Sequence, residues 1–281
     1  MATILDGKKV ADSIYTKLLF DVSLLPSIPK LVVVLVGNDP ASETYVRAKT
    51  KKAATLGLRS ETLTLPSSFS EEDLVKTIRG LNDDKDVHGI LVQLPLPKGI
   101  DRYKIMHAIS PLKDVDGLHP ENSGRLAEGN PRLVPCTAAG IIELLRFYSV
   151  GVEGKRAVIV GRSEIVGRPV AQLFLMHNAT VTICHSKTRN LEKEIRNAEI
   201  LIVAMGRPKF VIGEMVAPGT VVVDVGIHRT EDGLVGDVDF DSVAKVASAI
   251  SPVPGGVGPL TIAMLMRNLV QAAQLKSLSQ N

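Results

Sequence analysis

The stretch AVIVGRSEIVGRPVAQLFLMHNATVTICHSKTR, residues 157–189, decides the fold that the sequence predicts. It begins with a short apolar run rich in β-branched residues, continues through a glycine-containing turn into a helical pattern, and ends with a second apolar run. A strand, a helix and a second strand within this length form the βαβ unit of a parallel sheet. The stretch therefore predicts half of a Rossmann-type dinucleotide-binding domain.

The turn after the first strand carries a variant of the GxGxxG fingerprint. Gly161 supplies the tight turn, but Ser163 and Val166 stand at the positions of the second and third glycines, and Gly167 follows one place later. We expect the Ser163 side chain to keep a bound pyrophosphate slightly farther from the backbone than a glycine would. Taken alone, the motif also fits a structural turn that binds no ligand.

The end of the second strand indicates which dinucleotide the unit binds. In an NAD site a carboxylate at this point binds the ribose hydroxyls, whereas residues 185–189 read His-Ser-Lys-Thr-Arg and contain no acid. Ser186 and its basic neighbours suit a 2′-phosphate, and Arg162 in the glycine turn offers a bidentate guanidinium to the same group. NADP is therefore favoured over NAD, with a solvated basic loop as the open alternative.

Apolar runs on both sides of this stretch extend the sheet. Together with the two strands above they occupy residues 30–37, 88–97, 156–163, 179–186, 199–206 and 220–227. Strands that are apolar on both faces and alternate with helical patterns predict a parallel sheet covered by helices on each side, the α/β class. Between residues 113–120 and 131–137, Pro, Gly and Asn recur at short intervals, and there we expect a domain junction.

Composition excludes several classes of protein. The 281 residues are 45% hydrophobic, enough for one large or two ordinary domains. A net charge of +3 gives no strong field for nucleic acid or an anionic membrane. Cys136 and Cys184 form no CxxC pair, and no apolar run approaches the roughly 20 residues of a membrane span. We expect a globular protein of a reducing, cytoplasmic compartment, with no nucleic-acid or membrane partner.

A second glycine-rich segment lies near the C-terminus, in SPVPGGVGPLTIAMLMRNLVQAA, residues 251–273. Pro259 suits the first turn of a helix. Gly255, Gly256 and Gly258 allow the backbone to approach a flat ligand closely. A tight connection without a ligand explains the same glycines.

The basic segment SETYVRAKTKKAA, residues 42–54, contains a candidate catalytic lysine. Tyr45 precedes Lys49 by four residues, and residues at i and i+4 stand on one side of a helix. Lys52 shares that side, so spacing alone does not choose between the two lysines. A nucleic-acid contact or a solvated helix face remains the simpler interpretation.

Two further polar residues lie at the ends of predicted elements. Gln93 interrupts an apolar strand, where a polar group needs a partner, and a satisfied core glutamine is the alternative. Asp116 follows Asp114 in the sequence DVDG, which offers too few oxygen ligands for a calcium loop. The histidines show no zinc-ligand spacing, so we expect no metal.

Eight segments carry a resemblance in one order: PASETYVRAKTKKAATLGL, GILVQLPLP, KDVDGLHPENSGRL, VGRSEIVGRPVAQL, ATVTICHSKT, VVDVGIHR, GDVDF and PVPGGVGPLT. Together they resemble the bifunctional methylenetetrahydrofolate dehydrogenase/methenyltetrahydrofolate cyclohydrolase family. The resemblance runs from ILDGKKVA to the final helix and covers nearly the whole chain. It departs from the family at Ala138, where a proline commonly follows PCT, and at His228, where asparagine commonly follows VGI.

The resemblance implies two α/β domains with a cleft between them. A catalytic, folate-binding domain is expected at residues 1–120, with the final helix, 262–281, packing back on it. A Rossmann-type NADP-binding domain with a parallel sheet is expected at residues 121–281. The resemblance further implies that the enzyme is a homodimer.

The same resemblance assigns roles to residues. Lys49 matches the catalytic lysine, Tyr45 the tyrosine that stacks on the folate ring system, Gln93 the glutamine that holds the lysine, and Asp116 the aspartate that binds the pterin. The cofactor-binding positions match Gly161, Arg162, Ser163, Ile165, Ser186 and Ile227. Further substrate contacts are expected from the C-terminal loop at Pro254, Gly255, Gly256 and Thr261.

The implied activity has two steps. NADP-dependent oxidation converts 5,10-methylenetetrahydrofolate to the 5,10-methenyl form, and hydrolysis of that product gives 10-formyltetrahydrofolate. Lys49 is expected to be the general base, a role that a lysine takes at neutral pH when burial or a nearby cation lowers its pKa. The alternatives are a family member with one activity and another two-domain NADP-dependent dehydrogenase, such as a shikimate-type enzyme. Nucleic-acid binding is disfavoured because aromatic residues make up only 4% of the chain.

Overall fold

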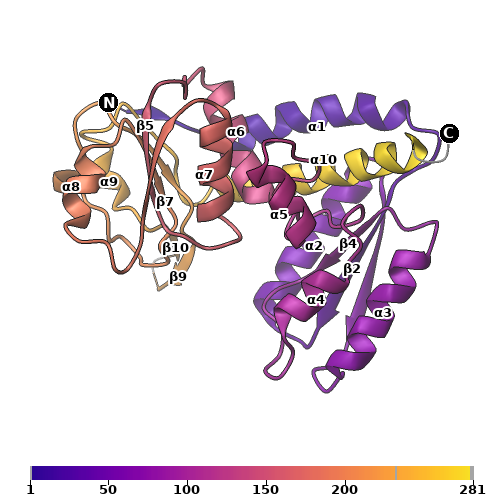
Figure 1. The fold of residues 1–281 in the computed structure, drawn as a ribbon. Helices are drawn as coiled ribbons and strands as arrows, with labels where there is room; N and C mark the ends of the chain where they lie inside the picture. Colours follow the sequence, from indigo (N-terminus) through magenta and orange to yellow (C-terminus); the bar gives the residue numbers. More distant parts are fainter. Residues whose placement is uncertain (1, 232, 279–281) are drawn as a thin grey trace. The chain divides into compact units, whose positions relative to one another are not determined.

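The computed structural model describes residues 2–231 and 233–278, which fall into two compact units. One unit combines the chain up to Ser13 with Pro135–Met264, and the other combines Ile14–Val134 with the chain from Leu265 onward. Each unit contains a parallel sheet with helices on both faces (Figure 1). The predicted α/β class is confirmed.

The unit that contains Lys49 is built on a three-stranded sheet in the order β3-β2-β4. β2 (Lys30–Val36) is central, and β3 (Arg59–Leu65) and β4 (Gly89–Val92) pair with it in parallel. Side chains alternate along a strand, and all residues from Leu31 to Val36 are buried, so both faces of β2 are covered.

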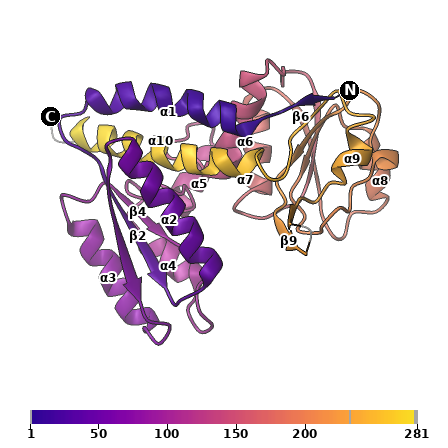
Figure 2. The same cartoon turned by 180° about the vertical axis from the view of Figure 1, so that it is seen from behind.

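Helices enclose this sheet from two sides. Val32, Val34 and Val36 share one core cluster with residues of α3 (Glu71–Asp83) and α4 (Arg102–Ala108). Helix α2 (Pro40–Thr55) lies on the opposite face (Figure 2). α5 (Pro120–Ala127) completes this unit.

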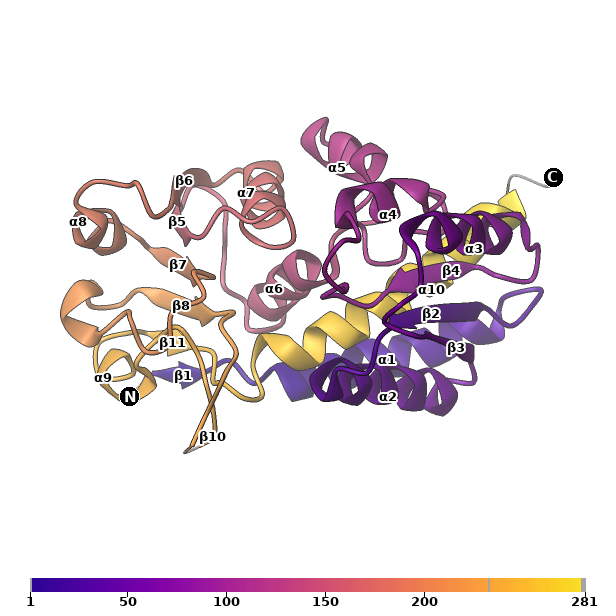
Figure 3. The same ribbon diagram turned by 90° about the horizontal axis from the view of Figure 1, so that it is seen from below.

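The second unit has a six-stranded parallel sheet in the order β1-β11-β8-β7-β5-β6. The strands are β1 (Thr3–Ile4), β11 (Ala249–Ile250), β8 (Val221–Asp224), β7 (Ile200–Val203), β5 (Arg156–Val160) and β6 (Thr180–Cys184). Helices α6 (Cys136–Phe147) and α7 (Gly167–Met176) cover one face, and α8 (Leu191–Arg196) and α9 (Phe240–Val243) the other (Figure 3). The predicted βαβ unit of residues 157–189 is formed by β5, α7 and β6.

The second unit also contains small elements, and two long helices contribute to both units. The 3-10 turn η1 (Gly213–Met215) follows β7. β9 (His228–Thr230) and β10 (Gly233–Val235) pair antiparallel, separate from the large sheet. Helices α1 (Gly7–Ser23) and α10 (Val257–Leu278) each have residues in both units.

Each of the six apolar runs contains a strand, as predicted. β3 was not predicted because RSETLTL is a polar edge strand with exposed positions. β1 and β11 have two residues each and depend on pairing between distant parts of the chain, since β1 pairs with β11 and β11 also pairs with β8. Local pattern carries no signal for such pairing. Among the described residues, the helices include none that is long and apolar enough to cross a membrane.

The units differ from the predicted limits 1–120 and 121–281. Because β1 pairs with β11, the N-terminal residues join the six-stranded sheet, and residues 121–134 stay with the first sheet. The final helix, α10, begins before the predicted position 262, and positions 279–281 of the predicted helix lie outside the described residues. Asn268 of α10 donates hydrogen bonds to the carbonyls of Val115 at 2.9 Å and Val134 at 2.8 Å.

Candidate active site

Helix α2 presents the predicted lysine. The Asp39 carboxylate accepts the N–H of Ser42 at 2.7 Å and caps the helix, and Pro40 occupies the first turn. Tyr45 is exposed on this helix and Lys49 is half-buried one turn later. The helix therefore starts directly after the sheet edge and carries both residues on its second and third turns.

Lys49 and Gln93 are in direct contact. The Lys49 Nζ donates a hydrogen bond to Gln93 Oε1 at 2.9 Å. Gln93 Nε2 donates to the carbonyl of Leu94 at 2.7 Å, and the backbone N–H of Gln93 donates to the carbonyl of Val34 at 2.9 Å. The Gln93 side-chain amide is thus hydrogen-bonded through both its oxygen and its nitrogen, and the Gln93 backbone remains bonded to the sheet.

The other basic residues of this helix have different partners. The Lys52 ammonium lies over the Tyr15 ring, 4.1 Å from its centroid. Arg47 pairs with Glu43 at 3.3 Å across one helical turn. The two lysines therefore differ in their partners, since it is Lys49 that meets Gln93, and the choice of Lys49 as the catalytic lysine stays a prediction.

Asp116 lies on a turn that a neighbouring carboxylate holds. Asp114 is buried beside β4, where it forms a parallel bridge with Ile90. Its carboxylate accepts the N–H groups of Gly117 at 3.1 Å and His119 at 2.7 Å. Asp116 is half-buried and lies between Asp114 and the anchored Gly117. Sequence reasoning gave Asp114 no role, although an aspartate three residues before a glycine is a known turn signal.

The predicted glycine turn depends on two glycines. Gly161 has φ +138°, and a Cβ atom there would lie 2.1 Å from the carbonyl oxygen of Ala204. A Cβ atom at Gly167 would lie 2.1 Å from the carbonyl oxygen of Gly161. Ser163 Oγ accepts the N–H groups of Val166 at 3.2 Å and Gly167 at 3.4 Å. The serine that replaces the second glycine thus caps the start of α7.

A cavity of about 400 Å³ lies at this turn. Its lining comes from the carboxyl ends of β5, β6 and β7 and the segments after them: Val160, Gly161, Arg162, Ser163, His185, Ser186, Thr188, Leu191, Ala204, Met205 and Arg207. Ligands of open parallel sheets bind at such carboxyl ends. Within the described part of the chain, no Asp or Glu lines this cavity.

The cavity unites only some of the predicted cofactor residues. Gly161, Arg162, Ser163 and Ser186 line it, whereas its lining does not include Ile165 or Ile227. Sequence reasoning missed a further cation in the lining, Arg207. Its position just beyond the apolar run 199–206 was the available signal, because the residues after a parallel strand face the ligand edge.

The C-terminal glycine loop packs against its own chain. The Gly255 carbonyl accepts the N–H of Gly7 at 2.9 Å, and a Cβ atom at Gly7 would lie 1.7 Å from the carbonyl oxygen of Gly256. Pro254 precedes these glycines, and Thr261 Oγ1 lies 3.2 Å from Thr137 Oγ1. This packing explains why residue 7 is glycine. Gly255 has a positive φ of +105°, and a Cβ atom at Gly256 would lie 2.5 Å from the Pro252 carbonyl oxygen, so these two glycines also have structural reasons. A role of the loop in substrate binding stays a prediction.

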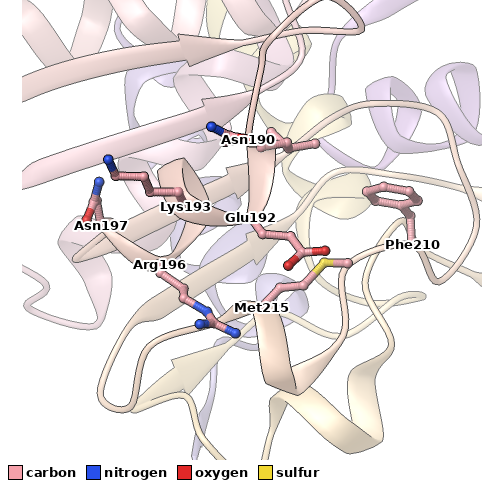
Figure 4. Close-up of a pocket in the computed structure, with 8 residues that line it drawn as sticks. Asn190, Glu192, Lys193, Arg196, Asn197, Phe210 and Met215 are labelled. Carbon is pink, nitrogen blue, oxygen red and sulfur yellow. The ribbon is translucent and has the colours of Figure 1, made fainter.

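A second hollow, of about 720 Å³, shares Leu191 with the first cavity. Its lining comes from α8 with its flanks and from the segment around η1 (Figure 4). The charged members are Glu192, Lys193 and Arg196, and the large apolar members are Phe210 and Met215. The residues that the sequence singles out for folate or cofactor binding lie elsewhere.

Comparison with known proteins matches both parts of the chain to one family. The model described as tetrahydrofolate dehydrogenase/cyclohydrolase, catalytic domain, matches residues 5–116, and its NAD(P)-binding domain matches residues 135–277. The Bifunctional protein FolD of Acetivibrio thermocellus is 50% identical over 280 residues, which cover 98% of each chain.

Solved structures agree with this match. The bifunctional FolD methylenetetrahydrofolate dehydrogenase/cyclohydrolase of Campylobacter jejuni has a TM-score of 0.96 at 46% identity, covering 98% of this chain and 100% of that one. The Trypanosoma brucei FolD enzyme, complexed with NADP cofactor and inhibitor, has a TM-score of 0.93 at 40% identity, covering 98% of both chains.

Proposed function

The chain belongs to the tetrahydrofolate dehydrogenase/cyclohydrolase family, and we propose that Lys49, Gln93 and Asp116 carry its folate chemistry. It is a bifunctional enzyme of one-carbon metabolism. NADP-dependent oxidation of 5,10-methylenetetrahydrofolate gives the 5,10-methenyl form, and hydrolysis of that product gives 10-formyltetrahydrofolate. The assignment of these steps to residues rests above all on the hydrogen bond between Lys49 and Gln93.

Lys49 is the proposed proton carrier of the hydrolytic step. Water adds to the cationic methenyl carbon, and it must lose a proton as the carbon–oxygen bond forms. A neutral Lys49 amine that donates one N–H to Gln93 Oε1 retains a nitrogen lone pair that can accept that proton. The resulting ammonium can return the proton to the folate nitrogen that leaves when the ring opens. Gln93 supports this role by fixing the amine in one position.

Asp116 and Tyr45 are the proposed folate-binding residues. A carboxylate suits the N–H groups of the pterin's amino-pyrimidinone edge, with which it can form two parallel hydrogen bonds. The Asp114 anchors hold the turn that presents Asp116. The exposed Tyr45 ring, one turn before Lys49, offers a flat surface on which the folate ring system can stack.

The cavity at Gly161 fits a dinucleotide. The turn at Gly161 packs against Ala204 too closely for any side chain, and the cavity lining beside it provides two arginines and three hydroxyl side chains, from Ser163, Ser186 and Thr188. When bound, NADP⁺ accepts the hydride from the methylene carbon of the folate. We assign its 2′-phosphate to Arg162 and Ser186, because a phosphate suits a guanidinium and a hydroxyl where NAD would need a carboxylate.

We further propose a cytoplasmic homodimer. β6 is an edge strand of the six-stranded sheet, and Ile183 on it is 41% exposed, as are Leu175 at 58% and Met176 at 37% on α7. An exposed edge with apolar side chains suits pairing with a second copy of the chain. Cys136 and Cys184 are buried thiols rather than halves of a disulfide, which suits a reducing compartment.

A two-stage absorbance assay tests the proposed function. The first stage follows reduction of NADP⁺ in the presence of 5,10-methylenetetrahydrofolate, and the second follows decay of the methenyl product after the cofactor is exhausted. Both signals are expected from the purified chain. Reduction without decay would leave a dehydrogenase alone. The absence of both signals would refute the assignment.

A further inference from the structure

A buried carboxylate holds the loop that lines the cofactor cavity. Asp237 has no solvent exposure. Its oxygens accept the backbone N–H groups of Met205 at 2.7 Å, Gly206 at 3.0 Å and Arg207 at 2.8 Å. A buried carboxylate without such donors would be costly. Three consecutive N–H groups directed at one side chain therefore fix the path of the loop.

His228 adds a side-chain donor to this set. Its Nε2 lies 2.7 Å from Asp237 Oδ1, the same oxygen that accepts the Arg207 N–H. The β9–β10 hairpin produces the contact, because His228 is paired with the last residue of β10 and the chain then continues through Gly236 to Asp237. A Cβ atom at Gly236 would lie 1.8 Å from Asp224 Oδ2, so the hairpin can approach this closely only with glycine there.

The loop carries a cationic side chain to the cavity. Met205 and Arg207 both line it, together with Arg162 from the glycine turn. The Arg207 guanidinium lies 4.1 Å from the centroid of the Phe210 ring. Arg207 is thus fixed twice, through its backbone by Asp237 and through its side chain by Phe210. Two guanidinium groups at one cavity suit the phosphates of a dinucleotide.

We infer that His228 and Asp237 are positioning residues that hold Arg207 for contact with a phosphate of the bound dinucleotide. The inference rests on the proposed cofactor site. Both residues act through the backbone of Met205–Arg207. Loss of the imidazole donor lets the Asp237 carboxylate and its loop shift, so affinity for the dinucleotide falls while turnover at saturating cofactor stays the same.

Steady-state dehydrogenase assays on three variants test the inference. His228→Ala is expected to raise KM for NADP⁺ about tenfold with kcat unchanged, the effect of losing a hydrogen bond to a charged group. Arg207→Ala is expected to raise KM by a similar factor. His228→Gln keeps an N–H donor at the position of the imidazole Nε2 and is expected to stay within about twofold of the wild type. His177→Ala, at an exposed histidine that ends α7, is the control and should match the wild type.

The outcomes separate this inference from the cofactor site on which it rests. An unchanged KM in Arg207→Ala would overturn the inference, and this variant alters an exposed side chain, so it remains informative if His228→Ala fails to fold. Equal KM values for His228→Ala and His228→Gln would also overturn it. If calorimetry detects no NADP⁺ binding to the wild type, the cofactor site itself falls, and the inference with it.

Discussion

Lys49 and Gln93, separated by 44 residues of chain, meet through a hydrogen bond of 2.9 Å between Nζ and Oε1. The contact follows from the order of the sheet. β2 leads into α2, which carries Lys49, and β4 ends directly before Gln93. Because β2 and β4 are adjacent parallel strands, their carboxyl ends lie at the same edge. The chemistry proposed for this edge thus depends on strand pairing as much as on the two side chains.

Lys49→Met should lower the rate of methenyltetrahydrofolate hydrolysis by about 10²-fold or more, because it removes the amine that transfers the proton. The decay of the methenyl absorbance measures it. Lys52→Met is the matched control, since Lys52 lies one turn away over the Tyr15 ring, and it should hydrolyse at nearly the wild-type rate. Near-normal hydrolysis by Lys49→Met would remove this lysine from the mechanism.

The double variant Arg162→Gln, Ser186→Ala should lower the preference for NADP⁺ over NAD⁺ about tenfold or more, because the 2′-phosphate loses a charged and a neutral hydrogen-bond donor. The ratio of kcat/KM values for the two cofactors measures it. Arg189→Gln removes an exposed cation of the same loop that does not line the cavity. That control should keep the ratio, and a double variant with an unaltered ratio would show that the phosphate binds elsewhere.

Asp224 should make folding stability depend on pH. Burial raises its pKa to about 6 from 3.8, against the opposing effect of the backbone N–H groups of Val238, Asp237 and Gly226. The folded state therefore binds this proton more tightly than the unfolded state does. The resulting stabilisation, on the order of 3 kcal/mol, is present in full below about pH 4 and is lost as the pH rises to about 6.

Asp224→Asn cannot release that proton and provides the comparison. The free energy of unfolding in urea, measured at several pH values, should favour the wild type over this variant more at about pH 4 than at about pH 7. The difference should level off above about pH 6. A difference that stays constant over this range would contradict the raised pKa of Asp224.

Asn268→Ala should destabilise the unit that contains α2. Asn268 is buried, and its amide donates to the carbonyls of Val115 and Val134. Its loss leaves two carbonyls without this donor, at a cost of about 2–4 kcal/mol. Urea unfolding followed by circular dichroism measures it. Gln274→Ala, at an exposed position of the same helix, should change stability by less than about 0.5 kcal/mol, and equal effects of the two would count against these hydrogen bonds.

Local sequence was sufficient for the parts of the fold that local physics specifies. The run KLVVVLVG predicts a buried strand because it is apolar on both faces, and β2 is that strand. Asp39 and Pro40 stand at the start of α2 in the structure, and their side chains suit a helix start because one caps and the other cannot donate an N–H. Elements with two residues, such as β1, carry too little pattern to be recognised alone.

The sequence by itself determined the α/β class, the βαβ unit around Gly161 and, through its resemblance, the family. Only the tertiary structure showed which partners Lys49 and Lys52 have, because both stand on one side of a helix and those partners, Gln93 and Tyr15, come from distant parts of the chain. It also revealed Asp237 beneath the Met205–Arg207 loop. Periodicity reports which way a side chain faces, whereas the partner that it finds there depends on how distant strands and hairpins pair.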